Sequence, residues 1–351
     1  MSPSISPKSI DVVIPSYNSA ETIERCLHGV TKSIDQSRRE GLCESVHIYI
    51  VDDGSTDSSI EHIQHFINTS VYPSTLLRQA QQGPSGARNS GTEAGTASWV
   101  LYIDSDVEPH EMALSNLIQL QSQQPDCLAI NGHPQQHVPN GSWITQYTNL
   151  SLCYQLMQHG PRVNTAFTSL CLMSRDGWSE MGGWDASRTS RYSDDIQSRW
   201  YFPPNSIAQC FDGLFIHHKH VRLFGLMKHR FNLGFHFRSS LSRKGTRSNS
   251  QRLLHWRYPV NVLCALSSPI VLSLPFIYPS LWFVSLLWCT PMIMVNNALI
   301  QFVRASKQPI FNTPFHLMSI FGLSYCEGCA MGLGLLISFC QDPFNGRFHD
   351  N

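Results

Sequence analysis

The stretch VHIYIVDDGSTD, residues 46–57, decides the fold class of this chain. Its first six residues are rich in β-branched and aromatic side chains, the composition of a buried strand. Asp52-Asp53-Gly54-Ser55 is a turn-forming sequence that ends the strand, and residues 58–66 have helical spacing. The stretch therefore predicts a strand, a turn that carries two carboxylates, and a helix.

The same alternation of strand and helix is predicted across the first hundred residues. The other predicted elements are strands at 10–15, 75–77 and 99–103 and helices at 21–30 and 86–95. Strands that alternate with helices predict an α/β fold with a doubly wound, mostly parallel, Rossmann-like sheet. Such sheets bind ligands at the carboxyl ends of their strands. The unusual polar clusters of this sequence lie at those predicted ends.

Charge is unevenly distributed along the 351 residues, although the formal net charge is zero. Residues 1–212 hold 22 of the 25 acidic residues, and ten Lys or Arg lie within 219–257. Residues 258–303 contain no charged residue, and 315–340 contain a single acid. Because two spans of about 20 residues fit the first apolar run, we expect C-terminal membrane helices, with the basic segment on the cytoplasmic side. A buried soluble core and an in-plane or re-entrant arrangement are the alternatives.

Two sequence features bear on the compartment and on the partners. Residues 1–9 lack the apolar core of a signal peptide, and the eleven cysteines show no framework spacing, so we interpret them as reduced and cytosolic. The basic segment lacks the aromatic and glycine spacing of common nucleic-acid-binding modules, which argues against a nucleic-acid partner.

Asp104-Ser105-Asp106 follows the predicted strand at 99–103. Alternate residues of a strand face the same way, so both carboxylates can converge on one hard cation such as Mg²⁺ or Mn²⁺. A cation there would neutralise the charge of a departing diphosphate. An acidic pair in an ordinary loop is the alternative.

Two further clusters suit a nucleotide. Asp53 can accept a hydrogen bond from a base or a ribose hydroxyl, and Gly54 lets a ligand approach the backbone. An Asx-type turn would explain the same residues equally well. Residues 83–89 place glycines and Arg88 ahead of a helix, which suits phosphate binding or a simple turn.

Taken together, these motifs resemble the inverting glycosyltransferases of family 2, which have the GT-A fold. The resemblance covers roughly residues 10–235 and runs through five motifs in order. They are VVIPSYN at 12–18, YIVDDGSTD at 49–57, GARNSG at 86–91, YIDSD at 102–106 and GGWD at 182–185.

The resemblance implies roles for individual residues on the donor side. Pro15, Tyr17 and Asp53 would line the nucleoside pocket, and Arg88 would approach the base or the phosphates. Asp104 would touch the ribose or the metal.

The resemblance also implies a metal site and an acceptor side. Asp106 would be the main ligand of Mn²⁺ or Mg²⁺ and His217 would complete the site, with His218 and His220 as possible substitutes. On the acceptor side, the implied residues are Gly183, Trp184 and Asp185.

A general base would have to take the proton of the acceptor hydroxyl. The candidates are Asp194 and Asp195, and Asp195 stands four residues before Arg199, where the family has its second acidic position. The acidic pair that the family carries slightly upstream falls on Tyr192-Ser193 here, so the base stays open between the two aspartates. A salt bridge or a helix cap is the alternative role for both.

The implied organisation divides the chain into consecutive segments. They are a tail at 1–9, a catalytic domain at 10–215 with a nucleotide-binding half at 10–107 and an acceptor half at 108–215, a basic and amphipathic membrane-proximal segment at 216–257, membrane helices at 258–340, and a tail at 341–351.

We therefore expect a membrane-attached enzyme that transfers a sugar, with inversion, from a nucleotide-diphosphate sugar to a glycan or lipid-linked acceptor. Its implied setting is the assembly of a polysaccharide or glycolipid. One alternative is a polyprenyl-phosphate sugar synthase, whose phosphate acceptor needs no strong base. Another is a non-catalytic membrane protein that keeps the fold to bind a partner.

Overall fold

The computed structural model describes residues 9–186, 197–198, 201–242, 257–278, 280, 282–311 and 314–341. These residues form two compact units. The sheet unit contains the described residues up to 138 and from 159 to 219. The helical unit contains residues 139–158 and the described residues after 219.

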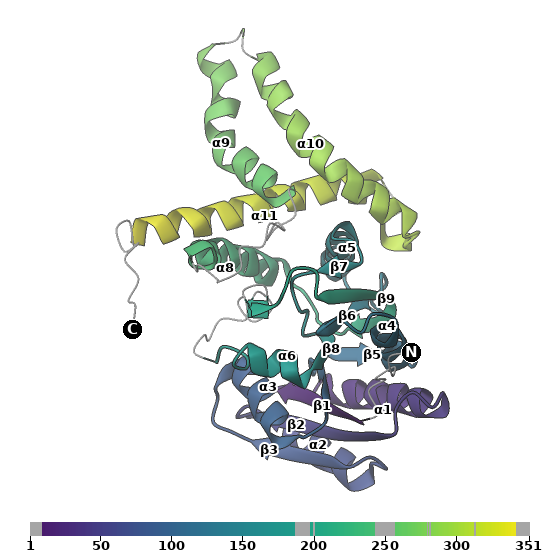
Figure 1. Ribbon diagram of the computed structural model, residues 1–351. Helices are drawn as coiled ribbons and strands as arrows, with labels where there is room; N and C mark the ends of the chain where they lie inside the picture. Colours follow the sequence, from purple (N-terminus) through teal and green to yellow (C-terminus); the bar gives the residue numbers. More distant parts are fainter. Residues whose placement is uncertain are drawn as a thin grey trace. The chain divides into compact units, whose positions relative to one another are not determined.

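The described part of the sheet unit contains a nine-stranded sheet in the order β3-β2-β1-β4-β8-β6-β9-β5, with β7 paired to β9 (Figure 1). The strands are β1 (Ser9–Ser16), β2 (Ser45–Asp52), β3 (Ser74–Arg78), β4 (Trp99–Ile103), β5 (Val107–Pro109), β6 (Ala129–Pro134), β7 (Arg162–Val163), β8 (Leu170–Ser174) and β9 (Ile207–His217). The helices of this unit are α1 (Ile23–Arg39), α2 (Ser59–Thr69), α3 (Gly83–Ala94), α4 (Ala113–Gln123) and α6 (Arg175–Glu180).

The strand directions confirm the predicted mostly parallel sheet. β1 is parallel to β2 and β4, and β2 is parallel to β3. β8 is antiparallel to both β4 and β6, and β9 is parallel to β6, so β6 and β9 point the same way as β4. β5 and β7 are antiparallel to β9. Six strands therefore end at the same edge of the sheet.

The sheet carries a hydrophobic cluster on each face, because alternate residues of a strand point to opposite sides. Ile14 of β1 belongs to a cluster that includes Leu27 of α1 and Leu117 of α4. Its neighbour Val13 belongs to the other cluster. Helix α3 packs on that second face so closely that a Cβ on Gly91 would lie 2.5 Å from a Val13 methyl carbon.

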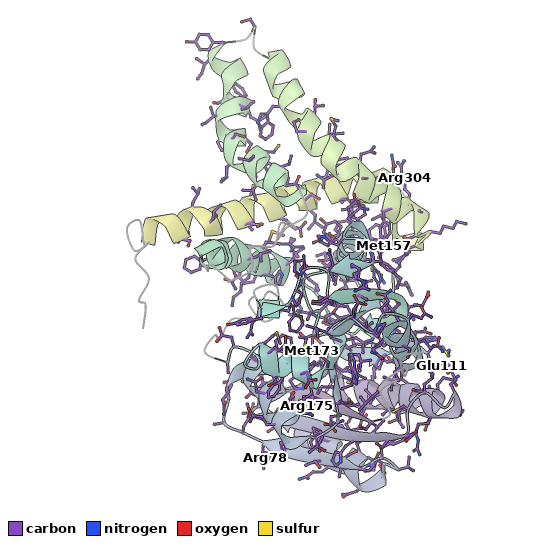
Figure 2. The ribbon with its side chains drawn as sticks, viewed as in Figure 1. Arg78, Glu111, Met157, Met173, Arg175 and Arg304 are labelled. Carbon is purple, nitrogen blue, oxygen red and sulfur yellow. The ribbon has the colours of Figure 1, made fainter. Side chains whose placement is uncertain are left out.

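Arg175, which is labelled in Figure 2, ties the amino ends of β1 and β4 together. Its Nη2 donates to Oδ2 of Asp11 at 2.7 Å, and its Nε donates to the carbonyl of Ala97 at 2.6 Å. The Asp11 carboxylate is buried, so this pairing satisfies a charge that would otherwise be costly to bury.

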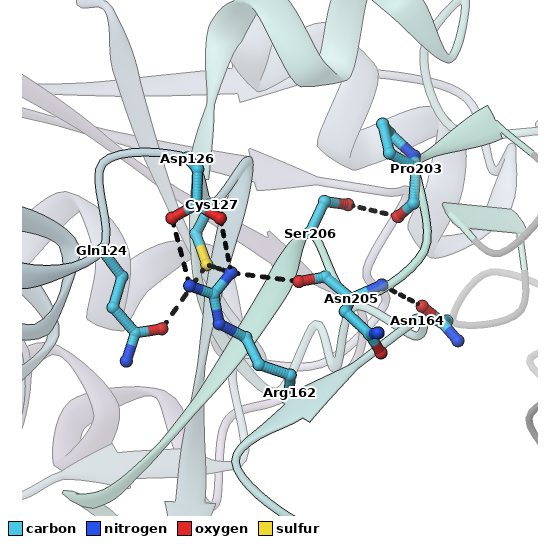
Figure 3. Close-up of polar contacts among 8 residues, drawn as sticks. All are labelled: Gln124, Asp126, Cys127, Arg162, Asn164, Pro203, Asn205 and Ser206. Carbon is cyan, nitrogen blue, oxygen red and sulfur yellow. Dashed lines mark hydrogen bonds and ion pairs between the residues drawn. The ribbon is translucent and has the colours of Figure 1, made fainter.

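A second arginine braces the approach to β9 (Figure 3). Arg162 of β7 donates from both terminal nitrogens to the carboxylate of Asp126, at 3.0 and 3.1 Å. The same side chain donates to the sulfur of Cys127 and to the carbonyl of Asn205. The brace therefore joins β7 to the chain just before β6 and to the turn that leads into β9.

The helical unit contains α5 (Trp143–Gln158), α8 (Leu223–Ser242), α9 (Arg257–Ile277), α10 (Trp282–Ala305), the short 3₁₀ helix η2 (Pro309–Phe311) and α11 (Pro314–Gln341). Helices α8 and α11 touch through their backbones: a Cβ on Gly234 would lie 1.9 Å from the Met331 carbonyl oxygen, and one on Gly334 would lie 2.0 Å from that of Phe231. Contacts of this kind are common between membrane helices.

The single acid of the last apolar run is buried within this unit. Glu327 of α11 is 2% exposed. Its Oε1 accepts from Nε of Arg230 in α8 at 2.7 Å, and its Oε2 accepts from the hydroxyl of Tyr147 in α5 at 2.6 Å. The side chain therefore joins three helices.

One helical segment of the described chain, Ser319–Ser338 of α11, is long and apolar enough to cross a membrane, and 44% of an 18-residue stretch within it is buried. The predicted spans within 258–303 correspond to α9 and α10, where Val260–Ser273 forms a shorter apolar stretch. The membrane helices stay a prediction.

Candidate active site at the carboxyl ends of the strands

The turn after β2 is tied to the loop before α3 by Asp53. The buried carboxylate accepts hydrogen bonds from Nε2 of Gln79 and from the backbone N–H groups of Gln82 and Gly83, each at 2.8 Å. An ionised carboxylate has about four acceptor positions, so Asp53 retains room for one more donor. Its predicted contact with a base stays a prediction.

The loop after β1 is fastened to the turn after β2. Asn18 adopts a positive φ of 48° and accepts from the backbone N–H of Thr56 at 2.8 Å through its side chain. Its own backbone N–H donates to the hydroxyl of Ser55 at 2.9 Å. Pro15 is buried within β1, whereas Tyr17 is 39% exposed and available to a ligand.

Asp104 follows β4 and is held by two side chains. Its Oδ1 accepts from Nη2 of Arg88 at 2.7 Å, and its Oδ2 accepts from the hydroxyl of Ser169 at 3.0 Å. The Arg88 side chain is 5% exposed and that of Asp104 is 27% exposed. The structure thus places the guanidinium of α3 against the first carboxylate of the acidic pair.

Asp106 lies beside His217, with 3.1 Å between Oδ2 and Nε2. The antiparallel pairing of β5 and β9 brings them together, because Val107 is in register with His217 and the His218 N–H donates to the Asp106 carbonyl at 2.7 Å. Burial raises the pKa of Asp106, but the charge and hydrogen bond of His217 and the charge of Lys219 outweigh it and lower the pKa to about 2. The carboxylate is therefore ionised at neutral pH.

The donor set suits a divalent cation in part. Among the described residues, no group of three or more His, Cys, Asp and Glu side chains converges as a metal site. Asp106 and His217 are adjacent, and an anionic oxygen with an imidazole nitrogen is a pair that Mn²⁺ accepts. Asp104 is engaged by Arg88 instead. The ligand set of Asp104, Asp106 and His217 stays a prediction.

The turn at 182–185, which is predicted to lie on the acceptor side, is fastened to α3 by Asn89. Its Oδ1 accepts from the backbone N–H of Trp184 at 2.7 Å and from Nε1 of Trp178 at 3.2 Å, while its Nδ2 donates to the Trp184 carbonyl at 2.7 Å. Gly183, with a φ of 79°, completes the turn. The backbone N–H of Asp185 donates to Oε1 of Gln197 at 2.7 Å.

Trp184 itself belongs to the hydrophobic core. It is 2% exposed and meets the ring of Tyr102 edge-on, with 5.4 Å between ring centroids. Its indole thus fixes the turn from inside. Sequence reasoning had assigned no role to Asn89, although its place beside Arg88 in the GARN motif was a signal.

The remaining predicted residues are the two candidate bases and the two substitute histidines. Asp194 and Asp195 lie outside the described residues. His220 belongs to the helical unit, whereas His218 belongs to the sheet unit and contacts Glu108, with 2.6 Å between Nε2 and Oε2.

Sequence comparison finds glycosyltransferases similar to part of the chain. Residues 11–176 match the family described as Glycosyl transferase family 2. The chain is 27% identical over 194 residues to glycosyltransferase AglE of Haloferax volcanii, which covers 53% of this chain and 61% of that protein. It is 32% identical over 116 residues to an uncharacterised glycosyltransferase, YibD, of Escherichia coli, and this match covers 33% of this chain and 31% of YibD. The match spans less than two thirds of these relatives' lengths.

Two solved structures are similar over most of the chain. The mannosyltransferase PcManGT from Pyrobaculum calidifontis, in complex with GDP-Man and Mn²⁺, shares 15% identity with a TM-score of 0.49, covering 92% of this chain and 86% of that one. Residues 1–349 of TarS from S. aureus, in complex with UDP, share 14% identity with a TM-score of 0.48, covering 97% and 93%. Because both scores are below 0.5, nothing about the ligands of this chain follows from them.

The sequence match lies almost entirely on the sheet unit, whose polar clusters meet at the carboxyl ends of β1, β2 and β4. The sheet unit, where most of this match lies, is therefore similar to the glycosyltransferases of family 2, over less than half of the chain.

Proposed function

We propose that the chain transfers a sugar from a nucleotide-diphosphate sugar to an acceptor hydroxyl, with inversion and with the help of Mn²⁺ or Mg²⁺. The observation that carries the proposal is the contact between Asp106 and His217 at the edge of the sheet. Asp106 is the second residue after Asp104, the first carboxylate of the acidic pair. The family match supports it. One relative, 30% identical over 110 residues, is a minor teichoic acid biosynthesis protein of Bacillus subtilis, which agrees with a role in polysaccharide or glycolipid assembly.

The residues of the site have complementary tasks in this proposal. Asp106 and His217 would hold the cation, which supplies positive charge for the leaving diphosphate. Arg88 fixes the orientation of Asp104, because the two side chains form an ion pair at 2.7 Å. Tyr17 is exposed enough to contact a nucleoside, and Asp53 retains one acceptor position for it.

The proposed reaction is a single displacement. The acceptor oxygen bonds to the anomeric carbon as the bond from that carbon to the diphosphate oxygen breaks, which inverts the configuration. Asp194 and Asp195 remain the proposed bases for the hydroxyl proton. If the acceptor were instead a lipid phosphate, its nucleophilic oxygen would need no such base. An Asp194/Asp195 double substitution that retains full transfer would therefore favour a polyprenyl-phosphate sugar synthase.

A thermal-shift screen tests the donor part of the proposal. UDP-, GDP- and dTDP-sugars are added with Mn²⁺, and one of them is expected to raise the melting temperature, because a ligand at 100 times its Kd stabilises the folded state by about 2.7 kcal/mol. Asp106→Asn should lose the Mn²⁺-dependent part of the shift. Glu93→Gln, which changes an exposed acid of α3, is the matched control. If no nucleotide-sugar shifts the wild-type protein, the non-catalytic alternative replaces the proposal.

We also propose that the α9–α10 segment lies in a membrane, with the catalytic domain on the cytoplasmic side. Large apolar side chains of α9 are exposed: Leu263 by 67%, Ile270 by 68% and Phe276 by 90%. At 1.5 Å per residue, the 21 residues of α9 extend about 31 Å, close to the thickness of a bilayer's hydrocarbon core.

Flotation with vesicles that contain anionic lipid tests this attachment. The wild-type protein is expected to float with the vesicles, and the double variant Ile270→Glu/Phe276→Glu to remain at the bottom. Val71→Glu, an exposed apolar position of the sheet unit, is the control and should float. Equal flotation of the double variant and wild type would remove these positions from the membrane contact.

A further inference from the structure

Two adjacent histidines at the end of β9 have different partners. His217 lies against Asp106, as described above. His218 is only 10% exposed, and its Nε2 lies 2.6 Å from Oε2 of Glu108. Its Nδ1 lies 3.4 Å from Nη1 of Arg25 in α1. The second histidine thus occupies the centre of a chain that runs from α1 to the β5 strand.

The partners of His218 determine where its proton is. A guanidinium can only donate hydrogen bonds, so Nδ1 must be the accepting nitrogen in its contact with Arg25. Nε2 then carries the hydrogen and donates it to Glu108. Both ring nitrogens are therefore used. In this arrangement His218 has no lone pair to offer a cation, which leaves His217 as the available imidazole.

The same chain controls the backbone that carries Asp106. Glu108 is two residues after Asp106, and the buried Val107 between them is paired with His217. The backbone N–H of His218 donates to the Asp106 carbonyl at 2.7 Å. His218 thus contacts the short strand β5 and the residue before it twice: its side chain contacts that of Glu108, and its backbone N–H donates to the carbonyl of Asp106.

We propose that Arg25, His218 and Glu108 form a positioning chain that keeps Asp106 and His217 at the separation a divalent cation requires. This inference rests on the proposed function, since it assigns a task to residues around the proposed cation site. The three residues do not touch the cation. They act through the β5 and β9 backbones, as partners outside the ligand shell commonly do in metal sites.

The experiment measures Mn²⁺ binding to the full chain by electron paramagnetic resonance, in the presence of UDP, GDP or dTDP, whichever raises the melting temperature. His217→Ala should abolish the coupling of Mn²⁺ to an imidazole nitrogen. His218→Ala should keep that coupling but weaken Mn²⁺ binding about 10- to 100-fold, the usual effect of losing such a partner. Arg25→Met, which removes the exposed end of the chain, should weaken binding in the same direction by less.

Glu24→Gln is the matched control. Glu24 is the neighbour of Arg25 in α1 and pairs with His62 at 2.6 Å, on the exposed side of the helix. Its Mn²⁺ affinity should equal that of the wild type. A melting temperature near that of the wild type in His218→Ala would separate weaker binding from general unfolding.

Two results would overturn the inference while leaving the proposed function intact. One is wild-type Mn²⁺ affinity in Arg25→Met or in His218→Ala, and the Arg25 variant decides the matter even if His218→Ala fails to fold. The other is loss of the nitrogen coupling in His218→Ala with retention in His217→Ala, which would make His218 the ligand. If the wild-type protein binds no Mn²⁺ with UDP, GDP or dTDP, the proposed function is refuted, and the positioning chain is refuted with it.

Discussion

Replacement of Asn89 by alanine is expected to destabilise the sheet unit and to release the turn at 182–185. Asn89 makes three hydrogen bonds, at 2.7, 2.7 and 3.2 Å, to Trp184 and Trp178. Each such bond contributes about 1 kcal/mol net. The substitution also leaves the N–H and C=O groups of Trp184 without these partners. Because the site is half-buried, water can replace part of the loss, so we expect about 2–3 kcal/mol.

A loss of that size lowers the melting temperature by about 4–12 °C in a unit of 150–250 residues. Asn116→Ala is the matched control, because Asn116 makes a single exposed hydrogen bond to the Asp212 carbonyl, at 2.7 Å. It should cost less than about 1 kcal/mol. Asn89→Asp retains the two accepting contacts and loses the donating one, so it should fall between the two. If Asn89→Ala melts within the range of the Asn116 control, the hydrogen bonds of Asn89 do not hold the turn.

Three further predictions concern the helical unit and the cation site. Glu327→Gln should lower the urea midpoint more than Tyr147→Phe, because the first removes the buried charge that pairs with Arg230, at about 3–5 kcal/mol. The second removes a hydrogen bond to that charge, at about 1.5–3 kcal/mol, and a hydroxyl contact with Ser324 at 3.2 Å; equal losses would contradict this. Gly334→Val should prevent the close contact of α8 and α11 and reduce the yield of folded protein in detergent, whereas a normal yield would refute the close packing. The pKa of Asp106, lowered to about 2, means that its contribution to stability is present above about pH 4 and lost as pH falls toward 2. The stability difference between wild type and His217→Ala should therefore be present at pH 5 and vanish near pH 2, and a difference that persists there would contradict the pairing.

The first half of the sheet could be predicted closely because its strands are short, apolar and ended by turn residues. The predicted strand at 99–103 coincides with β4, and that at 10–15 lies within β1. The predicted helix at 21–30 falls short of α1, which continues to Arg39. Residues 31–39 contain few apolar side chains, so their periodicity is weak although Ile34 is buried.

The later strands could not be predicted because their pairing depends on distant residues. β5 has three residues, and β9 contains the polar Gln209 and Asp212. Neither has the alternation that marks a strand. The strand β5 pairs with β9, and β9 pairs with β6 and β7 as well. The contact of Asp106 with His217 follows from the pairing of β5 with β9 alone. The resemblance to family 2 implied both residues as ligands, but only the fold brings them together.

The candidate site, like the sheet, could be predicted from the sequence only in part. Strand ends placed Asp53, Asp104 and Asp106 at one edge of the sheet, as their motifs predicted. The partners that hold them were not visible in the sequence, because Gln79 and Ser169 are ordinary polar residues outside the motifs. Their roles arise from loops that fold back to the strand ends.

The most direct test of the central claim is calorimetric titration of the purified chain with UDP and GDP, with Mn²⁺ and with EDTA. The account predicts that one nucleotide binds at least about tenfold more tightly with Mn²⁺, a gain of about 1.4 kcal/mol, and that Asp106→Asn and His217→Ala both lose this gain. Equal affinity with Mn²⁺ and with EDTA in the wild type, or a full Mn²⁺-dependent gain in Asp106→Asn, would contradict the account.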